Sequence, residues 1–143
     1  MEFDVDRVIS FEGETGPYLQ YAHTRCVSIL RKAHETGIAF DETKLNLSAL
    51  SSVYQAPAEM MLLKALGKFP ATLERTLEQR KPSQLCIYLI DLTRDFGVFY
   101  RECKVMNPGD QKQSLARIAL VEATRRIMAL GLDLLGIPKP EKM

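Results

Sequence analysis

A single run of regularly spaced apolar residues constrains the fold of this chain more than any other feature. Between Pro82 and Cys103, apolar side chains recur at steps of three and four residues, at Leu85, Leu89, Leu92, Phe96, Phe99 and Cys103. This spacing places them on one side of an α-helix. Proline suits the first turn of that helix, because its missing N–H would have no partner there. The segment therefore predicts a long helix with one buried face that other elements must cover.

Three further segments have helical signals, whereas signals for strands are weak. Residues 17–35 begin at Pro17 and stop at Gly37, a second segment runs from Pro57 to Arg80, and a third covers 110–135. Pro70 breaks or kinks the second segment. The expected apolar stripe of the second segment consists of Met60, Leu63, Leu66, Leu73 and Leu77. That of the third segment consists of Ala116, Leu120, Ala123, Ile127, Leu130 and Leu134. The sequence predicts an all-α fold, a helical bundle of four to five main helices.

Composition limits the classes of protein that the chain can belong to. Its 143 residues form one expected domain, 1–143, with 46% apolar and 26% charged residues. The formal net charge is only +1, so a nucleic-acid site must rest on a local cluster of residues. No apolar run reaches the roughly 20 residues that a membrane helix needs. Three cysteines without a close pair indicate reduced thiols, and we expect a cytoplasmic monomer.

The first helical segment carries an uncommon set of side chains on one face. Tyr18, Tyr21 and Arg25 share this face, and Ser28 and Lys32 continue it. Aromatic rings, a guanidinium and a nearby cation are the groups that grip unpaired nucleobases. The spacing alone favours a second interpretation, in which the tyrosines pack partly into the core and the arginine is solvated.

The chain offers little for catalysis or metal binding. His23 shares the apolar stripe with Leu19 and Cys26, and we expect it to be packed and hydrogen-bonded. His23 and Cys26 do not make a zinc site, and no Cys-x-x-Cys completes one. Neither a glycine-rich phosphate loop nor a Ser/His/Asp set is evident. We expect no catalytic residue and no metal ligand.

Several segments match a known family in the right order along the chain. They are Phe11–Arg25, Pro82–Tyr100, Ala116–Leu120, Gly131–Ile137 and Pro140–Met143. Together they resemble the C-terminal anticodon-binding (DALR-type) domain of arginyl-tRNA synthetases, which is a helical bundle. The resemblance runs from about Phe3 to Met143. The opening Gly-Glu-Thr-Gly-Pro-Tyr-Leu-Gln-Tyr run favours the arginine enzyme over its relatives.

The resemblance implies which residues touch RNA. In the family, tyrosines and an arginine of the first helix contact the anticodon loop, together with residues from the end of the third helix, the loop after it and the end of the chain. Some members carry a tryptophan near that loop, and this chain contains none. The implied RNA-binding residues are Tyr18, Tyr21, Arg25, Tyr100, Met106, Arg117 and Met143.

The resemblance also implies a function and partners. The domain would hold the anticodon stem-loop of tRNA(Arg), with residues 1–16 as a lead-in from a catalytic domain that uses ATP and Mg²⁺. The His-x-Gly-His and Lys-Met-Ser-Lys signatures of class I synthetases are absent here, so no cofactor is expected in this chain. Two alternatives stay open: the anticodon-binding domain of another class I or a glycyl synthetase, and a helical protein-interaction bundle with no RNA role.

Overall fold

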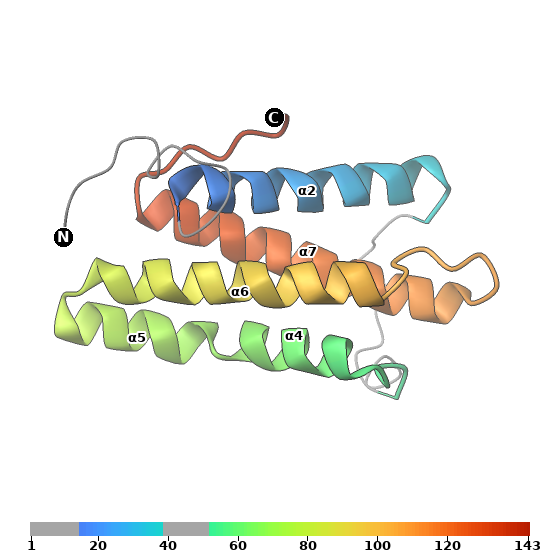
Figure 1. Cartoon of the computed structure of the whole chain (residues 1–143), viewed down its shortest axis with the longest axis horizontal. Helices are drawn as coiled ribbons and strands as arrows, with labels where there is room; N and C mark the ends of the chain where they lie inside the picture. The colour runs from blue at the N-terminus through green and yellow to red at the C-terminus, as the bar shows by residue number, and fades with distance from the viewer. Residues whose placement is uncertain (1–14, 39–51) are drawn as a thin grey trace.

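The computed structural model describes residues 15–38 and 52–143, and these form an all-helical structure (Figure 1). The described residues contain α2 (Gly16–Glu35), α4 (Pro57–Gly67), α5 (Phe69–Gln79), α6 (Pro82–Glu102) and α7 (Gln111–Leu134). No strand occurs within these two ranges. The predicted all-α bundle is therefore confirmed. Most of the expected lead-in, residues 1–14, lies outside the described residues.

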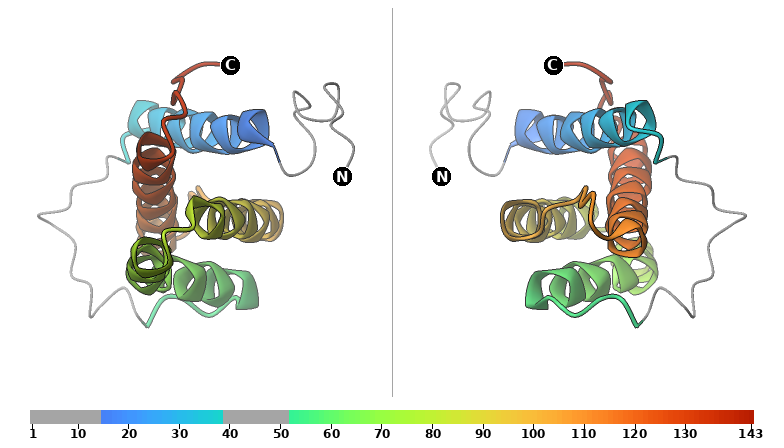
Figure 2. Two further views of the ribbon diagram at one scale, coloured as in Figure 1. Left: turned by 90° about the vertical axis from the view of Figure 1, so that its left-hand side faces the viewer. Right: turned by 90° about the vertical axis from the view of Figure 1, so that its right-hand side faces the viewer.

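The long helices α6 and α7 form the centre of the bundle. Helix α2 covers one side and contacts chiefly α7, whereas α4 and α5 cover the other side and contact chiefly α6 (Figure 2). Within the described parts of the chain, no helix is long and apolar enough to cross a bilayer.

Both ends of α2 follow from local chemistry. The Thr15 hydroxyl accepts a hydrogen bond from the Tyr18 N–H at 3.3 Å, and Pro17 occupies the first turn. At the other end, Gly37 has a φ of +82°. The N–H groups of Gly37 and Ile38 donate to the carbonyls of His34 and Ala33, each at 3.0 Å. This is a Schellman ending, which favours glycine, and it confirms the predicted stop.

The predicted apolar face of α6 is confirmed. All six of its expected residues are buried: Leu85, Leu89, Leu92, Phe96, Phe99 and Cys103. Helix α7 approaches this face closely at Gly131, where an added Cβ would lie 2.7 Å from the Leu89 methyl groups. A side chain at position 131 would therefore require the buried Leu89 side chain to move or α6 and α7 to separate.

The predicted break near Pro70 is confirmed, whereas the predicted apolar stripe through residues 57–80 is confirmed at Leu66 and wrong at Met60, Leu63 and Leu77. The segment forms two helices, because α4 ends at Gly67 and α5 starts at Phe69 with Pro70 in its first turn. The break can change the phase of the stripe only after Gly67, so it accounts for the exposed Leu77 but not for Met60 and Leu63. Met60 and Leu63 are exposed, as is Leu77. The buried residues of α4 are Ala58, Glu59, Leu62, Ala65 and Leu66.

The predicted stripe of α7 is also wrong towards its end. Leu130 and Leu134 are exposed, whereas Met128 and Leu132 are fully buried. Helix α7 packs against α2, α4 and α6, so its buried surface is broad. That surface includes polar residues that a search for apolar periodicity passes over, namely Ser114, Arg117, Glu122 and Thr124.

Candidate nucleic-acid interface

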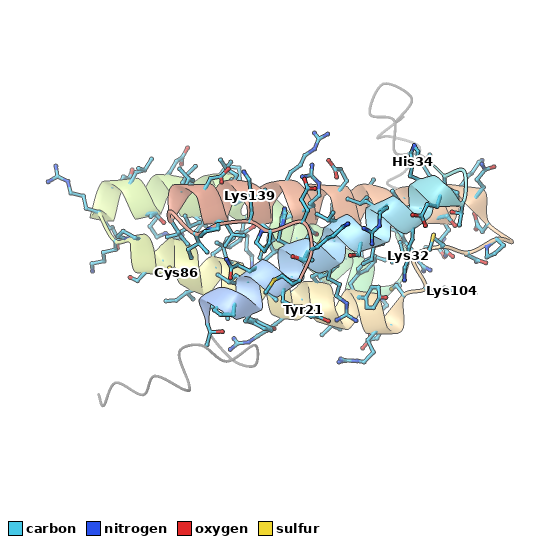
Figure 3. The ribbon with its side chains drawn as sticks, turned by 90° about the horizontal axis from the view of Figure 1, so that it is seen from above. Tyr21, Lys32, His34, Cys86, Lys104 and Lys139 are labelled. Carbon is cyan, nitrogen blue, oxygen red and sulfur yellow. The ribbon has the colours of Figure 1, made fainter. Side chains whose placement is uncertain are left out.

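Helix α2 presents part of its expected binding face to solvent. Tyr21 is 46% exposed and Arg25 is exposed one turn further on. Tyr21 and Lys32 lie on the upper side of the molecule, and Lys104 lies near Lys32 (Figure 3). Tyr18 differs from them, because it is half-buried and packs against the core. Its contact with RNA stays a prediction.

A pocket of about 550 Å³ lies beside this face. Three separate parts of the chain line it: α2, the end of α6 with the loop after it, and the last residue of the chain. Five of the seven residues implied by the resemblance meet there, namely Tyr21, Arg25, Tyr100, Met106 and Met143. The remaining lining residues are Thr24, Ser28, Ile29, Lys32, Cys103, Lys104 and Val105.

Arg25 and Tyr100 form a preorganised pair at the pocket. The Arg25 Cζ lies 4.2 Å from the centroid of the Tyr100 ring, a cation–π contact. Phe96 supports that ring from α6, with ring centroids 6.3 Å apart. The guanidinium is thus held over an aromatic plane, and its N–H groups can serve as donors to a ligand.

The loop that carries Lys104 and Met106 is fixed by hydrogen bonds to α7. The Ser114 hydroxyl accepts from the Asn107 N–H at 2.8 Å and lies 3.0 Å from the Asn107 carbonyl. Arg117 Nη1 donates to the Lys104 carbonyl at 2.8 Å. The Thr36 hydroxyl also lies 3.7 Å from the Met106 sulfur, which links the loop to the end of α2. These contacts hold one wall of the pocket in place.

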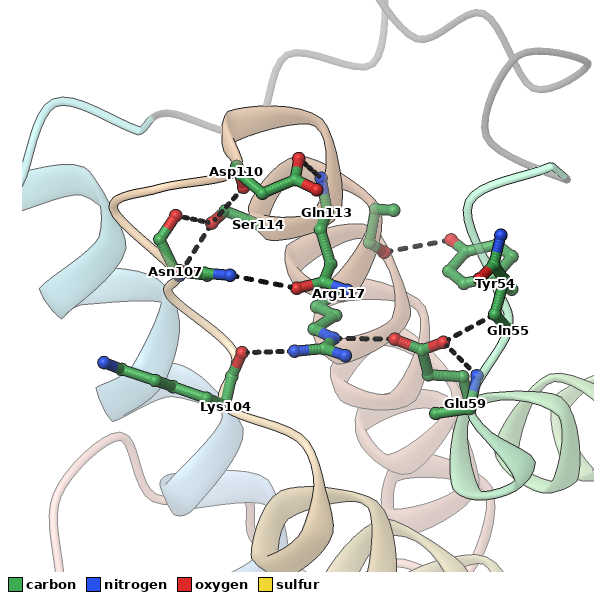
Figure 4. Close-up of polar contacts among 11 residues, drawn as sticks. Tyr54, Gln55, Glu59, Lys104, Asn107, Asp110, Gln113, Ser114 and Arg117 are labelled. Atoms are coloured by element: carbon green, nitrogen blue, oxygen red, sulfur yellow. Dashed lines mark hydrogen bonds and ion pairs between the residues drawn. The ribbon is translucent and has the colours of Figure 1, made fainter.

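Arg117 has a structural role inside the molecule, and its implied contact with RNA stays a prediction. Its side chain is buried, and its Nε donates to Glu59 Oε1 at 2.6 Å (Figure 4). Glu59 in turn accepts from the backbone N–H groups of Gln55 and Ala56 at the start of α4. The guanidinium therefore joins α4, α7 and the Lys104 loop inside the molecule, and Arg117 does not line the pocket.

The chain end returns to α2. Gln20 Nε2 donates to the Pro138 carbonyl at 2.7 Å, and the Thr24 hydroxyl donates to the Pro140 carbonyl at 2.9 Å. His23 Nδ1 lies 3.3 Å from the same Pro140 oxygen, and the ring is 3% exposed. The prediction of a packed, hydrogen-bonded histidine is confirmed.

Burial lowers the pKa of His23 from its ordinary value of 6.5. The hydrogen bond to Pro140 opposes this effect, while the charges of Arg125 and Lys139 add to it and that of Glu141 opposes it. The folded protein therefore favours the neutral ring, and between the lowered pKa and 6.5 the unfolded chain binds more protons.

Stability is consequently expected to rise with pH across the window below 6.5 and to be lost as pH falls through it. Urea unfolding at about pH 5.5 and about pH 7.5 measures this slope, and His23→Asn, which cannot titrate, should flatten it. An equal slope in both proteins would mean that His23 carries no pH-dependent stability.

Positive charge on α7 is largely engaged in ion pairs. Glu122 accepts from Arg126 Nε at 2.7 Å across one helical turn, as its i, i+4 spacing predicts. The same carboxylate accepts two hydrogen bonds from Arg125, each at 2.8 Å. Within residues 15–38 and 52–143, no group of three or more His, Cys, Asp or Glu side chains could hold a metal ion.

Comparison with known proteins places nearly all of the described bundle in one family. The sequence model of the family described as the DALR anticodon binding domain matches residues 19–143. The chain belongs to the DALR anticodon-binding domain family.

Relatives of this DALR domain are parts of larger proteins. An arginine–tRNA ligase of Cutibacterium acnes is 39% identical over 99% of the chain, and one of Frankia casuarinae is 43% identical over 99%. The solved arginyl-tRNA synthetase of Thermus thermophilus superimposes with a TM-score of 0.75 at 37% identity, over 94% of the chain. The chain spans only 26%, 22% and 22% of these three proteins, respectively.

Sequence reasoning missed two kinds of residue in this DALR domain. Lys104 lines the pocket. The sequence feature that could have indicated it is a cation directly after the apolar face of α6 ends, two residues before Met106. Glu59 is 1% exposed, and its signal was a lone carboxylate within the apolar run of α4. Such a group is buried only when it has a partner, and its partner lies 58 residues away in sequence.

Proposed function

We propose that this chain is the anticodon-binding domain of an arginine–tRNA ligase, and that its pocket receives an unpaired base of the tRNA(Arg) anticodon loop. The observation that carries this proposal is the meeting of Tyr21, the Arg25–Tyr100 pair, Met106 and Met143 around one pocket. The membership of the DALR family supports it independently. The relatives named above are arginine enzymes, which favours arginine over the other synthetases.

The chemistry of the pocket suits a splayed-out base. Aromatic rings offer stacking surfaces, and a guanidinium offers donors to base acceptors. A volume of about 550 Å³ lies within the range of small-molecule sites. Every arginine codon has G at its centre, so every arginine anticodon has a central C. We therefore assign the pocket to the central C, whose ring acceptors Arg25 can meet.

Local charge compensates for a chain that is nearly neutral overall. Lys32 and Lys104 both line the pocket, and the formal net charge of the chain is +1. Two ammonium groups beside the base site can meet the phosphates that flank an everted base. Affinity thus rests on a small charged area around an aromatic pocket.

The remaining functions of the proposed ligase belong to other parts of it. Activation of arginine with ATP and Mg²⁺ is assigned to its catalytic domain, which is the second partner of this domain, and no cofactor is assigned to this chain. The domain is proposed to act as a monomer in the cytoplasm. A protein-interaction bundle without an RNA role is the rival, and RNA binding separates the two.

The test is a titration of the chain against an RNA stem-loop that carries an arginine anticodon. The RNA is about 17 nucleotides long, which closes the seven-base loop on a short stem. We expect the wild-type chain to bind this RNA and to prefer it over the same stem-loop with the central C changed to U by about five- to 150-fold, the range of one well-placed base contact. Equal affinity for both RNAs would remove the central C from the proposal, and no binding to either would favour the interaction bundle.

Salt provides an internal check on this titration. A single-stranded loop contributes about −0.7 per neutralised phosphate to the slope of log affinity against log salt. With few cations at the pocket we expect a shallow slope. A slope as steep as about −8 would place the main source of affinity elsewhere.

A further inference from the structure

The C-terminal tail depends on α2 for its path. After α7 the chain turns back and runs over α2, so that Met143 comes to the pocket (Figures 1 and 3). Pro138 and Pro140 have no N–H group, so at these two residues only the carbonyl oxygens can form backbone hydrogen bonds. Side chains of α2 supply the donors: Gln20 to Pro138, and Thr24 with His23 to Pro140.

The Pro140 carbonyl is held from two adjacent positions of α2. The Thr24 hydroxyl lies 2.9 Å from the Pro140 oxygen and 3.0 Å from the Gln20 carbonyl, so its single proton serves two acceptors. A carbonyl oxygen only accepts, so His23 contributes a bond only when Nδ1 carries the proton. Both side chains are buried, at 6% and 3% exposed, which keeps water from replacing them.

The clamped carbonyl is close enough to determine where the chain end lies. Met143 lies three positions after Pro140, so the tether spans at most about 10 Å. Thr24 itself lines the pocket beside Arg25 and Met143. Without the clamp, Met143 would be tethered only through the earlier part of the tail and would sample many positions.

We propose that Thr24 and His23 are positioning residues, which clamp the Pro140 carbonyl and thereby seat Met143 as one wall of the base pocket. This proposal rests on the proposed function, because the wall matters only if the pocket binds RNA. The clamp itself, however, exists or fails in the free protein. Two separate measurements can therefore distinguish the two proposals.

The first measurement follows Met143 without RNA, in chain labelled at the methionine methyl groups. The Met143→Ala spectrum identifies the Met143 signal among the six methionines. In wild type we expect cross-relaxation between this methyl and the ring protons of Tyr21 or Tyr100, which line the same pocket. Thr24→Val with His23→Leu removes both donors at similar volume and should abolish these contacts. Thr24→Ser with His23→Asn keeps both donors and should preserve them.

Survival of the contacts in the donor-free double variant would overturn the clamp. Should that variant fail to fold, as judged by circular dichroism, Thr24→Val and His23→Leu are measured separately, and undiminished contacts in both single variants would overturn the clamp. Loss of the contacts in both double variants would likewise overturn the proposal, because the donors would then not be the cause.

The second measurement is a double-mutant cycle on binding of the arginine stem-loop. Thr24→Val should weaken binding about three- to tenfold, the range for one hydrogen bond. In a Met143→Ala background it should weaken binding by less than about twofold, because the wall that it positions is already gone. Equal losses in both backgrounds would make Thr24 a direct RNA contact and overturn its positioning role. A wild-type chain that binds no RNA would refute the proposed function, while the methyl contacts would still decide the clamp.

Discussion

Glu59→Ala is expected to destabilise the domain by about 3–5 kcal/mol, because it leaves the buried guanidinium of Arg117 without its counter-charge. The change also removes the acceptor for the N–H groups of Gln55 and Ala56. Urea unfolding followed by circular dichroism measures the loss. Because Arg117 also holds the Lys104 carbonyl, the pocket loop should loosen in the same variant.

A paired substitution controls for the buried charge. Replacing Glu59 and Arg117 together by methionine removes both charges at comparable volume, and exchanges of this kind are often neutral or stabilising. The double variant should therefore be more stable than Glu59→Ala. Its cost should come only from the backbone groups that lose partners. If the free energy of unfolding of Glu59→Ala lies within about 0.5 kcal/mol of the wild-type value, the ion pair does not hold the bundle together.

Arg25→Ala is expected to weaken binding of the arginine stem-loop by about 1–3 kcal/mol, or five- to 150-fold in affinity. Arg25 is exposed on α2 and contacts the Tyr100 ring at the pocket, so the change removes donors and charge from the binding face. The fold should survive, since exposed positions outside the core contribute little to the free energy of unfolding. Fluorescence titration with labelled RNA measures the loss.

Arg31→Ala is the matched control for charge. Arg31 is exposed on the same helix but does not line the pocket, and its removal changes the net charge equally. It should affect affinity far less. If Arg25 reads the central C, Arg25→Ala should also lose most of the preference for C over U. If Arg25→Ala weakens binding of both RNAs equally, Arg25 contacts a phosphate and does not read the base. If it weakens binding of neither RNA, this face of α2 is an ordinary solvated surface.

Local patterns sufficed to predict helices whose boundaries and burial are set locally. Proline at the start and glycine at the end define α2, and the six-residue apolar face defines α6. The same reasoning failed where burial depends on distant neighbours. Helix α7 has three packing partners, so Leu130 lies outside the core while Thr124 lies inside it.

For the candidate site, too, local features could be predicted and long-range contacts could not. The stacking and charged groups of α2 could be read from spacing, and the resemblance to a family supplied Tyr100, Met106 and Met143. The supports of these groups could not be read in this way. Glu59 and Arg117 meet across 58 residues, and Thr24 meets Pro140 across 116. Only the folded arrangement shows that one implied contact, Arg117, holds the pocket loop from within.

Each wall of the pocket has its own anchor within the described bundle. Arg25 rests on Tyr100, the Lys104 loop is held by Arg117, and the tail is held by Thr24. Arg117 lies on another helix and shares no bonding partner with the other two anchors, so its substitution should combine nearly additively with theirs in the free protein. Thr24 and Arg25 are neighbours on α2, so changes at these two walls should show epistasis. The Lys104 wall could accordingly diverge in sequence while the other two stay as they are.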